Sequence, residues 1–159
     1  NDNGPSYLRL ERGPVNLGEF QSTNFELGKS NTLLEGKDLT IISSGGITEV
    51  AINVAKKLKN KGISLGVVSM HTLKPIDEEV IIRSIDNSGG IITIEENNLM
   101  GGLGSAVAEV CLDRGYHPKK FKRIGMKDKY SSVVGSQEYL RNYYEMDEIA
   151  LELAVMELL

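Results

Sequence analysis

Hydrophobic and polar positions follow a regular pattern from about residue 38 onward. Residues 39–43 form a compact apolar run rich in β-branched side chains, which is typical of a strand buried on both faces. The chain then turns at Ser44-Gly45-Gly46. The next segment has apolar residues at helical spacing, namely Val50, Ala51, Val54, Ala55 and Leu58, with Gly62 where a helix C-cap is expected. The pattern predicts one strand followed by one helix.

The same cycle repeats along the rest of the chain. Further strands are predicted at 63–70, 90–95 and 121–126, and further helices begin near Asp77, after Gly101–Gly104 and at Asp147. Thr48 and Asp77 are the expected N-caps of the first two helices. Alternating strands and helices of these lengths predict an α/β fold, a three-layer α/β/α sandwich with a mostly parallel sheet. We expect about five strands, with an antiparallel edge strand as an allowed variation.

The first 38 residues are less regular. Residues 6–10 predict a short strand, which Pro14 ends because proline has no N–H for a strand ladder. Residues 15–22 show no sustained period and are interpreted as a linker. Residues 25–34 predict either a weak strand or two short strands with a bend at Gly28.

Composition narrows the class of protein. The 159 residues fit one domain, and 40% apolar with 25% charged residues is ordinary for a globular protein. A net charge of -4 argues against nucleic-acid binding. The local basic cluster around Lys120-Phe121-Lys122 favours a charge-protected edge strand over an anion site. No apolar run is long enough to span a bilayer. The single cysteine, Cys111, suits the cytoplasm, and the first residue, Asn1, suggests a fragment.

Two glycine-rich loops follow predicted strands. The stretch Gly101-Gly102-Leu103-Gly104-Ser105 lies where backbone N–H groups can hold an anion. It does not complete a dinucleotide fingerprint, because Val107 stands where the third glycine is needed, and the chain has no Walker A sequence. A tight turn with close approach to the sheet or to a neighbouring chain is therefore favoured over an anion site. The loop at Ser43–Gly46 is interpreted in the same way.

Few side chains are suited to catalysis or metal binding. His71 follows a strand, but without a nearby Cys or second His it favours a structural or interface role over a metal site. Cys111 lies on an apolar helix face, which favours packing. Glu95 and Glu96 end a strand; they could orient a loop or share a proton, or they could simply be solvated. These residues alone predict a soluble α/β domain without a convincing active site.

Four segments in order carry a family resemblance: residues 7–14 (YLRLERGP), 36–45 (GKDLTIISSG), 71–77 (HTLKPID) and 95–107 (EENNLMGGLGSAV). The first resembles the end of the pyrimidine-binding domain of transketolases, and the other three resemble signatures of their carboxy-terminal domain. Met126-Lys127-Asp128 departs from a Pro-Asp turn common in relatives, which concerns only the loop shape. The chain is similar to the C-terminal domain of a transketolase, as part of a fused or a split enzyme.

The resemblance implies a full enzyme that transfers a two-carbon ketol unit between sugar phosphates, as in the pentose phosphate pathway, using thiamine diphosphate and a divalent metal such as Mg. Neither cofactor is expected on this chain, which has no Gly-Asp-Gly motif. The glutamate that activates the cofactor is expected in the pyrimidine-binding domain, outside this chain. No catalytic residue is expected here, so the isolated chain should be inactive. The resemblance assigns Arg12 to the phosphate of the sugar substrate, against a surface salt bridge with Glu11 or Glu19 as the alternative.

The resemblance also implies an organisation and partners. Residues 1–20 are expected to be the tail of the pyrimidine-binding domain with a linker, and residues 21–159 the C-terminal domain. The expected partners are the remaining domains or subunit, in a cytoplasmic homodimer. His71, Glu95, Glu96, Gly101, Gly102 and Gly104 are candidates for an interface or the approach to the active site. Alternatives are the same domain of 1-deoxyxylulose-5-phosphate synthase or of a 2-oxo acid dehydrogenase β-subunit, and a stand-alone anion-binding or interaction module.

Overall fold

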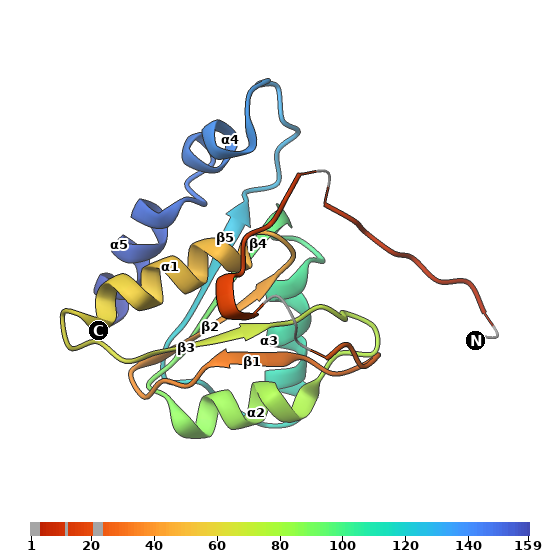
Figure 1. Cartoon of the computed structure of the whole chain (residues 1–159). Coiled ribbons are helices and arrows are strands. Elements are labelled where there is room, and N and C mark those ends of the chain that lie inside the picture. Colours follow the sequence, from red (N-terminus) through yellow and green to blue (C-terminus); the bar gives the residue numbers. More distant parts are fainter. Residues whose placement is uncertain (1–3, 12, 21–23) are drawn as a thin grey trace.

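The computed structural model describes residues 4–11, 13–20 and 24–159. Its β-strands form one five-stranded sheet in the order β1-β3-β2-β4-β5, in which β1 is antiparallel to β3 and the other pairs are parallel (Figure 1). The strands are β1 (Asn31–Leu34), β2 (Leu39–Ser44), β3 (Leu65–Ser69), β4 (Ile91–Asn98) and β5 (Phe121–Met126). The predicted mostly parallel sheet with one antiparallel edge strand is confirmed.

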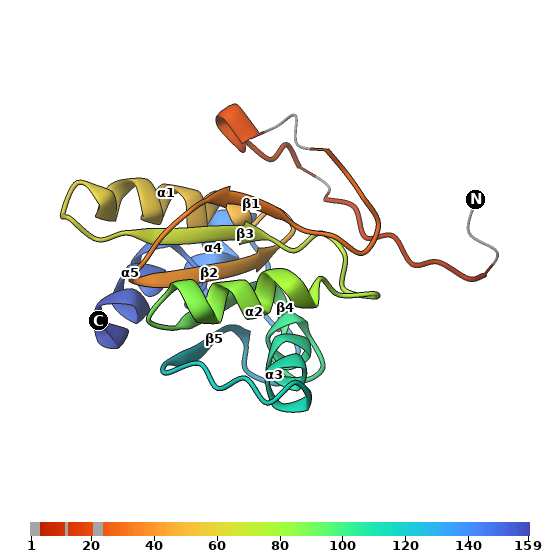
Figure 2. The ribbon, with the colours of Figure 1, turned by 90° about the horizontal axis from the view of Figure 1, so that it is seen from below.

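Helices cover both faces of this sheet (Figure 2), so the predicted three-layer sandwich is also confirmed. Helices α1 (Thr48–Lys59) and α5 (Glu148–Leu158) pack on one face, and α2 (Glu78–Asn87) and α3 (Leu103–Asp113) pack on the other. A short helix, α4 (Gln137–Tyr143), precedes α5, and a 3-10 turn, η1 (Gly18–Phe20), lies in the amino-terminal segment. None of the α4 residues is buried.

The central strands bury both faces because their neighbouring side chains alternate between the two cores. Ile41 packs among the residues of α1 and α5, whereas Ile42 packs among those of α2 and α3. Val67 and Val68 of β3 divide in the same way. Cys111 is buried on the α3 side, in agreement with its predicted packing role.

Three local predictions need correction. Residues 6–10 lie in no strand of the described part of the chain; they run away from the domain in Figure 1, with Tyr7 and Leu8 exposed. A strand needs a neighbour for its backbone groups, and no strand of this sheet lies beside that segment. The strand predicted within 25–34 is only Asn31–Leu34, because the chain turns at Gly28, which has a positive φ of 82°.

The third correction concerns the start of α1. Its N-cap is Ile47 rather than Thr48, and Thr48 is the first helical residue. The Thr48 hydroxyl donates to the carbonyl oxygen of Gly45 at 2.8 Å and accepts from the Ser43 hydroxyl at 2.9 Å, so it closes the preceding turn instead. Asp77 does cap α2, since its carboxylate accepts from the backbone N–H of Val80. The predicted edge position of β5 is confirmed as well.

Candidate functional site

The carboxyl ends of β2 and β4 lie next to one another and form the edge where the candidate residues meet. Ser44 of β2 is in register with Glu95 of β4. The chain leaves β2 for β3 on one side, and β4 lies on the other side, so the strand order changes direction here. Sites in α/β sheets usually form at such a switch point. Both glycine-rich loops begin at this edge.

Glu95 caps helix α3. Its side chain is buried, with an exposed fraction of 3%, and its two carboxylate oxygens each accept a hydrogen bond of 2.8 Å. The donors are the backbone N–H groups of Leu103 and Gly104. Gly102 at the N-cap has no side chain to satisfy these first-turn donors, so the strand residue takes that part. A solvated role for Glu95 is therefore wrong.

The glycines of this loop allow the close approach. A Cβ on Gly102 would lie 2.0 Å from Oε2 of Glu95, and one on Gly104 would lie 2.7 Å from the Thr93 hydroxyl oxygen. Gly101 has a positive φ of 76°, which side chains rarely adopt. These distances explain the glycines by packing against the sheet, as predicted. The anion position at the start of α3 is already filled by a carboxylate of the same chain.

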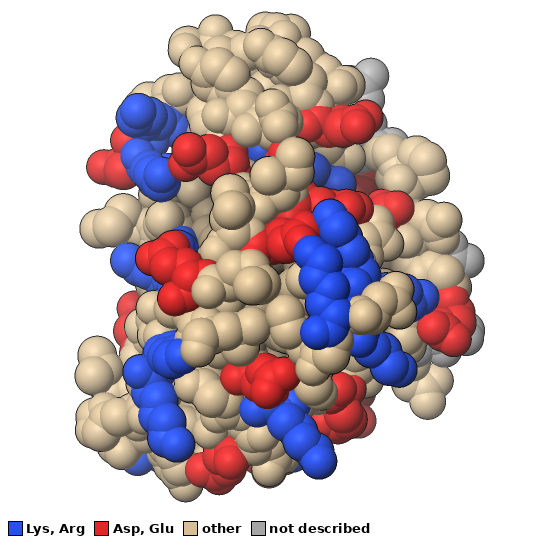
Figure 3. All heavy atoms as spheres, turned by 90° about the vertical axis from the view of Figure 1, so that its left-hand side faces the viewer, with Lys and Arg blue, Asp and Glu red and all other residues tan. Residues whose placement is uncertain are grey.

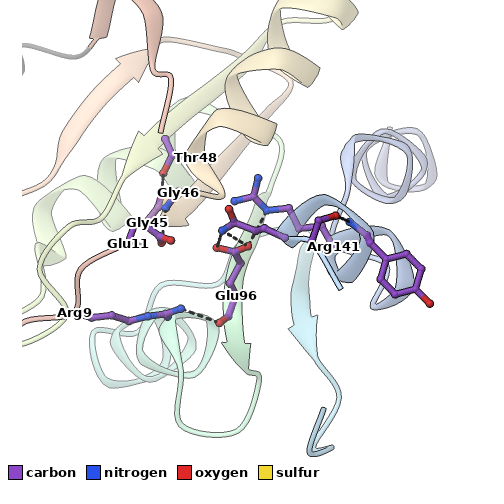
Figure 4. A network of polar contacts seen from close by, with 10 residues as sticks. Arg9, Glu11, Gly45, Gly46, Thr48, Glu96 and Arg141 are labelled. Atoms are coloured by element: carbon purple, nitrogen blue, oxygen red, sulfur yellow. Dashed lines mark hydrogen bonds and ion pairs between the residues drawn. The ribbon is translucent and has the colours of Figure 1, made fainter. Parts of the chain in front are cut away.

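Glu96 points to a different helix. Its carboxylate accepts from Nε of Arg141 at 2.7 Å and from the Gln137 side-chain amide at 3.0 and 3.1 Å (Figure 4). Both side chains of the Glu96–Arg141 ion pair are only 14% exposed. Successive residues of a strand face opposite sides of the sheet, so Glu95 reaches α3 whereas Glu96 reaches α4. The interpretation that the two carboxylates share a proton is therefore wrong.

The loop between β2 and α1 receives another carboxylate. The backbone N–H of Gly46 donates to Oε1 of Glu11 at 3.1 Å (Figure 4). Gly45 has a positive φ of 80°, in agreement with a tight turn. In addition, Nη2 of Arg9 donates to the backbone carbonyl oxygen of Glu96 at 3.4 Å. The amino-terminal segment thus contacts both strand ends.

His71 lies apart from this network. Its Nδ1 is 2.9 Å from the Thr72 hydroxyl, and its ring lies at a centroid distance of 4.8 Å from the ring of Phe25. Nε2 is buried without a hydrogen-bond partner among the described residues. Burial lowers the pKa of His71, and the negative charge of Asp77 opposes this shift. Within the described ranges, no group of three or more His, Cys, Asp or Glu side chains could hold a metal ion.

Some functional predictions fall elsewhere. Arg12 lies outside the described residues, so its predicted phosphate contact stays a prediction. Its alternative salt-bridge partners have other contacts, since Glu11 accepts from Gly46 and Glu19 pairs with Lys56 at 3.4 Å. The sequence reasoning missed Arg141 and Gln137. The hydrophilic segment before Asp147 offered no periodic signal that would have paired it with the end of β4.

The outer face formed by α1 and α5 carries charges of both signs. Lys57 and Lys61 of α1 both pair with Glu152 of α5, at 2.6 and 2.8 Å. Figure 3 shows positive and negative side chains interspersed over the face that it displays, with an uncharged region at the top. A nucleic-acid surface would instead gather positive charge. No described helix is long and apolar enough to cross a membrane.

The chain is thus a three-layer α/β domain. At the switch point of its sheet, carboxylates of the same chain accept the backbone N–H groups of both glycine-rich loops. Comparison with known proteins then gives the family. Residues 28–148 match the family described as "Transketolase, C-terminal domain". The chain belongs to this family.

Similar proteins come from several organisms. A "putative transketolase C-terminal section" of Methanocaldococcus jannaschii is 40% identical over 157 residues, which are 97% of this chain and 48% of that protein. A 1-deoxy-D-xylulose-5-phosphate synthase of Syntrophus aciditrophicus is 33% identical, over 98% of this chain and 24% of that protein. A solved structure, "Split gene transketolase, inactive beta4 tetramer", superposes with a TM-score of 0.76 at 36% identity, over 85% of this chain and 43% of that chain. The chain thus spans about half or less of each of these proteins.

Proposed function

We propose that this chain is the carboxy-terminal domain of an enzyme that transfers a two-carbon ketol unit from a ketose phosphate to an aldose phosphate. The observation that carries the proposal is the family match over 28–148, together with 40% identity to a transketolase C-terminal section. The domain boundary near residue 20, with a preceding pyrimidine-binding domain, is part of the same proposal. So are the cytoplasmic location and the homodimer.

Thiamine diphosphate and its metal belong to the rest of this proposed enzyme. The glycine loop before α3 does not fit a diphosphate, because the buried Glu95 carboxylate already accepts the N–H groups that would bind it. The residues that the structure describes also offer no metal-binding group. A thiamine diphosphate titration of the isolated chain should therefore detect no tight binding. An activity assay of the isolated chain should detect no transferase activity. Tight binding would contradict this assignment.

The part of the reaction assigned to this chain is substrate recognition through Arg12. A guanidinium stays charged and can bind phosphate through two parallel hydrogen bonds. In the assembled enzyme, Arg12→Ala should raise KM at least tenfold for phosphorylated substrates, about the loss of one charge-assisted hydrogen bond, and leave unphosphorylated analogues nearly unchanged. Equal increases for both kinds of substrate would rule out the phosphate role.

A synthase of 1-deoxyxylulose-5-phosphate is the second candidate, favoured by the 33% identical relative from Syntrophus aciditrophicus. The two reactions use different donors. An assay of the assembled enzyme with a ketose phosphate and with pyruvate separates them, because the proposed ketol transfer requires the former. With an aldose phosphate as the acceptor in both assays, turnover of pyruvate but not of the ketose phosphate would favour the synthase.

A further inference from the structure

Helix α5 is apolar on two opposite sides. One side packs into the core through three buried residues, Leu151, Ala154 and Val155. The other side carries an outer stripe, Ile149, Leu153 and Met156, whose exposed fractions are 64%, 66% and 52%. At about 3.6 residues per turn, the outer stripe lies on the side of the helix opposite the buried one. A helix that is apolar on all sides is normally buried, so the outer stripe is a surface that a partner would cover.

A groove lies beside the outer stripe. It has a volume of about 380 Å³, and Ile149 and Leu153 line it together with the edge strand β5. Ile124 of β5 and Ala154 of α5, which are both buried, also line it. Ridges of side chains on one surface pack into grooves of another. A ridge beside a groove can therefore bind a second copy of itself, because a two-fold axis places each ridge in the groove of the other copy.

The charges that border the outer stripe are paired within the chain. On the α1 side, Glu152 pairs with Lys57 and Lys61 at 2.6 and 2.8 Å. On the β5 side, Glu157 pairs with Lys122. Each border thus carries both signs of charge, so the borders of two copies can place Lys beside Glu without repulsion. A nucleic acid or a strongly charged peptide would find no complementary charge here.

This face also has the size of an interface between two copies. The outer stripe, the groove and the two borders extend from α1 across α5 to β5. Together they come close to the roughly 20 residues that a standard interface uses on each side. Residues 4–11 of the same chain do not cover this face, because they run away from the domain on the side of Figure 1 opposite α5.

We infer that this face of α5 and β5 binds a second copy of the chain across a two-fold axis, with the two α5 helices antiparallel. The outer stripe has the spacing of a coiled-coil seam, four residues and then three. An antiparallel pairing places Leu153 beside the same residue of the second copy and Ile149 opposite Met156. The interface rests on the homodimer of the proposed function and requires no ketol transfer.

The test is sedimentation equilibrium of the chain at concentrations up to about 500 μM, where contacts of micromolar affinity are populated. The unaltered chain should form dimers. Leu153→Glu should raise the dissociation constant of the dimer about 100-fold or more, because two carboxylates would meet at the axis of an apolar contact.

Leu112→Glu is the matched control. Leu112 is 69% exposed and belongs to α3, which packs on the other face of the sheet. This variant should change the dissociation constant by less than about twofold. Circular dichroism should show that both variants are folded, since each replaces an exposed helical side chain by another good helix former.

A second set of variants tests the antiparallel pairing. Ile149→Glu and Met156→Lys should each weaken the dimer about tenfold or more. The double variant should dimerise about tenfold more tightly than either single variant, because each new carboxylate then faces an ammonium group of the second copy. Neighbours on the surface of one helix are three or four residues apart, so residues 149 and 156 of the same chain do not supply this pairing.

A chain that stays monomeric over this concentration range would overturn the interface. A dimer that Leu153→Glu leaves intact, or that Leu153→Glu and Leu112→Glu weaken equally, would also overturn it, while the proposed homodimer would stand through another surface. A double variant that is no tighter than the single variants would overturn the antiparallel pairing. None of these measurements includes a substrate, so a failure of the proposed ketol transfer would leave the interface standing.

Discussion

The two glycine loops at the sheet edge solve the same problem in different ways. Each loop leads into a helix, and each offers backbone N–H groups to a carboxylate. At α3 the carboxylate is Glu95, which is buried and binds two N–H groups from only eight and nine residues away. Near α1 it is Glu11, which binds one N–H from 35 residues away and lies exposed. The first contact belongs to the core, whereas the second can open without disturbing it.

The largest expected difference between the loops is in stability. Glu95→Ala should lower the free energy of unfolding by about 3 kcal/mol, because two buried N–H groups lose their acceptor. Glu11→Ala should lower it by less than about 0.5 kcal/mol, since water replaces an exposed contact. Urea unfolding of the two variants measures both values. Similar losses for the two variants would abolish the distinction between the loops.

Alanine at the two loop glycines gives the next largest contrast. Gly102→Ala should cost about 2 kcal/mol, because its Cβ would overlap a buried carboxylate that cannot move away. Gly46→Ala should cost less than about 1 kcal/mol, since the exposed Glu11 and Val15 can shift. The comparison uses the same urea titration. A greater loss for Gly46→Ala would mean that the amino-terminal segment is part of the core.

The Glu96–Arg141 ion pair is intermediate between the buried contact of Glu95 and the exposed contact of Glu11. Its variants show which of the two it resembles. Arg141→Ala should lower stability by about 1.5 kcal/mol, less than full removal of a buried ion-pair partner, because Gln137 still donates to Glu96. A double-mutant cycle with Glu96→Gln measures the coupling between the two side chains. A coupling energy near zero would place this pair with ordinary surface contacts.

The smallest effect is expected at Glu152, whose carboxylate is bound by two exposed lysine side chains. Hydrogen bonds from Lys57 and Lys61 lower the pKa of Glu152 below its ordinary value of 4.5. A carboxyl group with a lower pKa in the folded state stabilises the fold above the unfolded pKa, and this contribution is lost as the pH falls through the folded pKa. Glu152→Gln should therefore flatten the loss of stability below about pH 4.5. An unchanged pH profile would show that the ion pairs contribute nothing.

Much of the fold follows from the sequence because its signals are local. The β-branched run of β2 and the apolar stripe of α1 can each be recognised within a few residues of sequence. The strand predicted at residues 6–10 shows the limit of such signals. Its apolar residues suit a strand, but a strand forms only beside another strand, and a sequence pattern does not say whether one is present.

The candidate site was less predictable than the fold. Alternation along β4 could have separated Glu95 from Glu96, because neighbouring strand residues face opposite sides. Their partners could not have been found in this way. Arg141 is 45 residues from Glu96, and Glu11 is 35 residues from Gly46, so each pairing depends on the complete topology.

The hydrogen bonds of Glu96 also have a consequence for the order of folding. Its contacts join residues that are 41, 45 and 87 positions apart, whereas those of Glu95 span only eight or nine. Contacts across long loops carry a larger entropic cost and form slowly. On a ribosome, the α3 cap can form soon after residue 104 emerges. Docking of α4 must wait until Arg141 has been made, so the contact between α4 and the end of β4 forms later than the α3 cap.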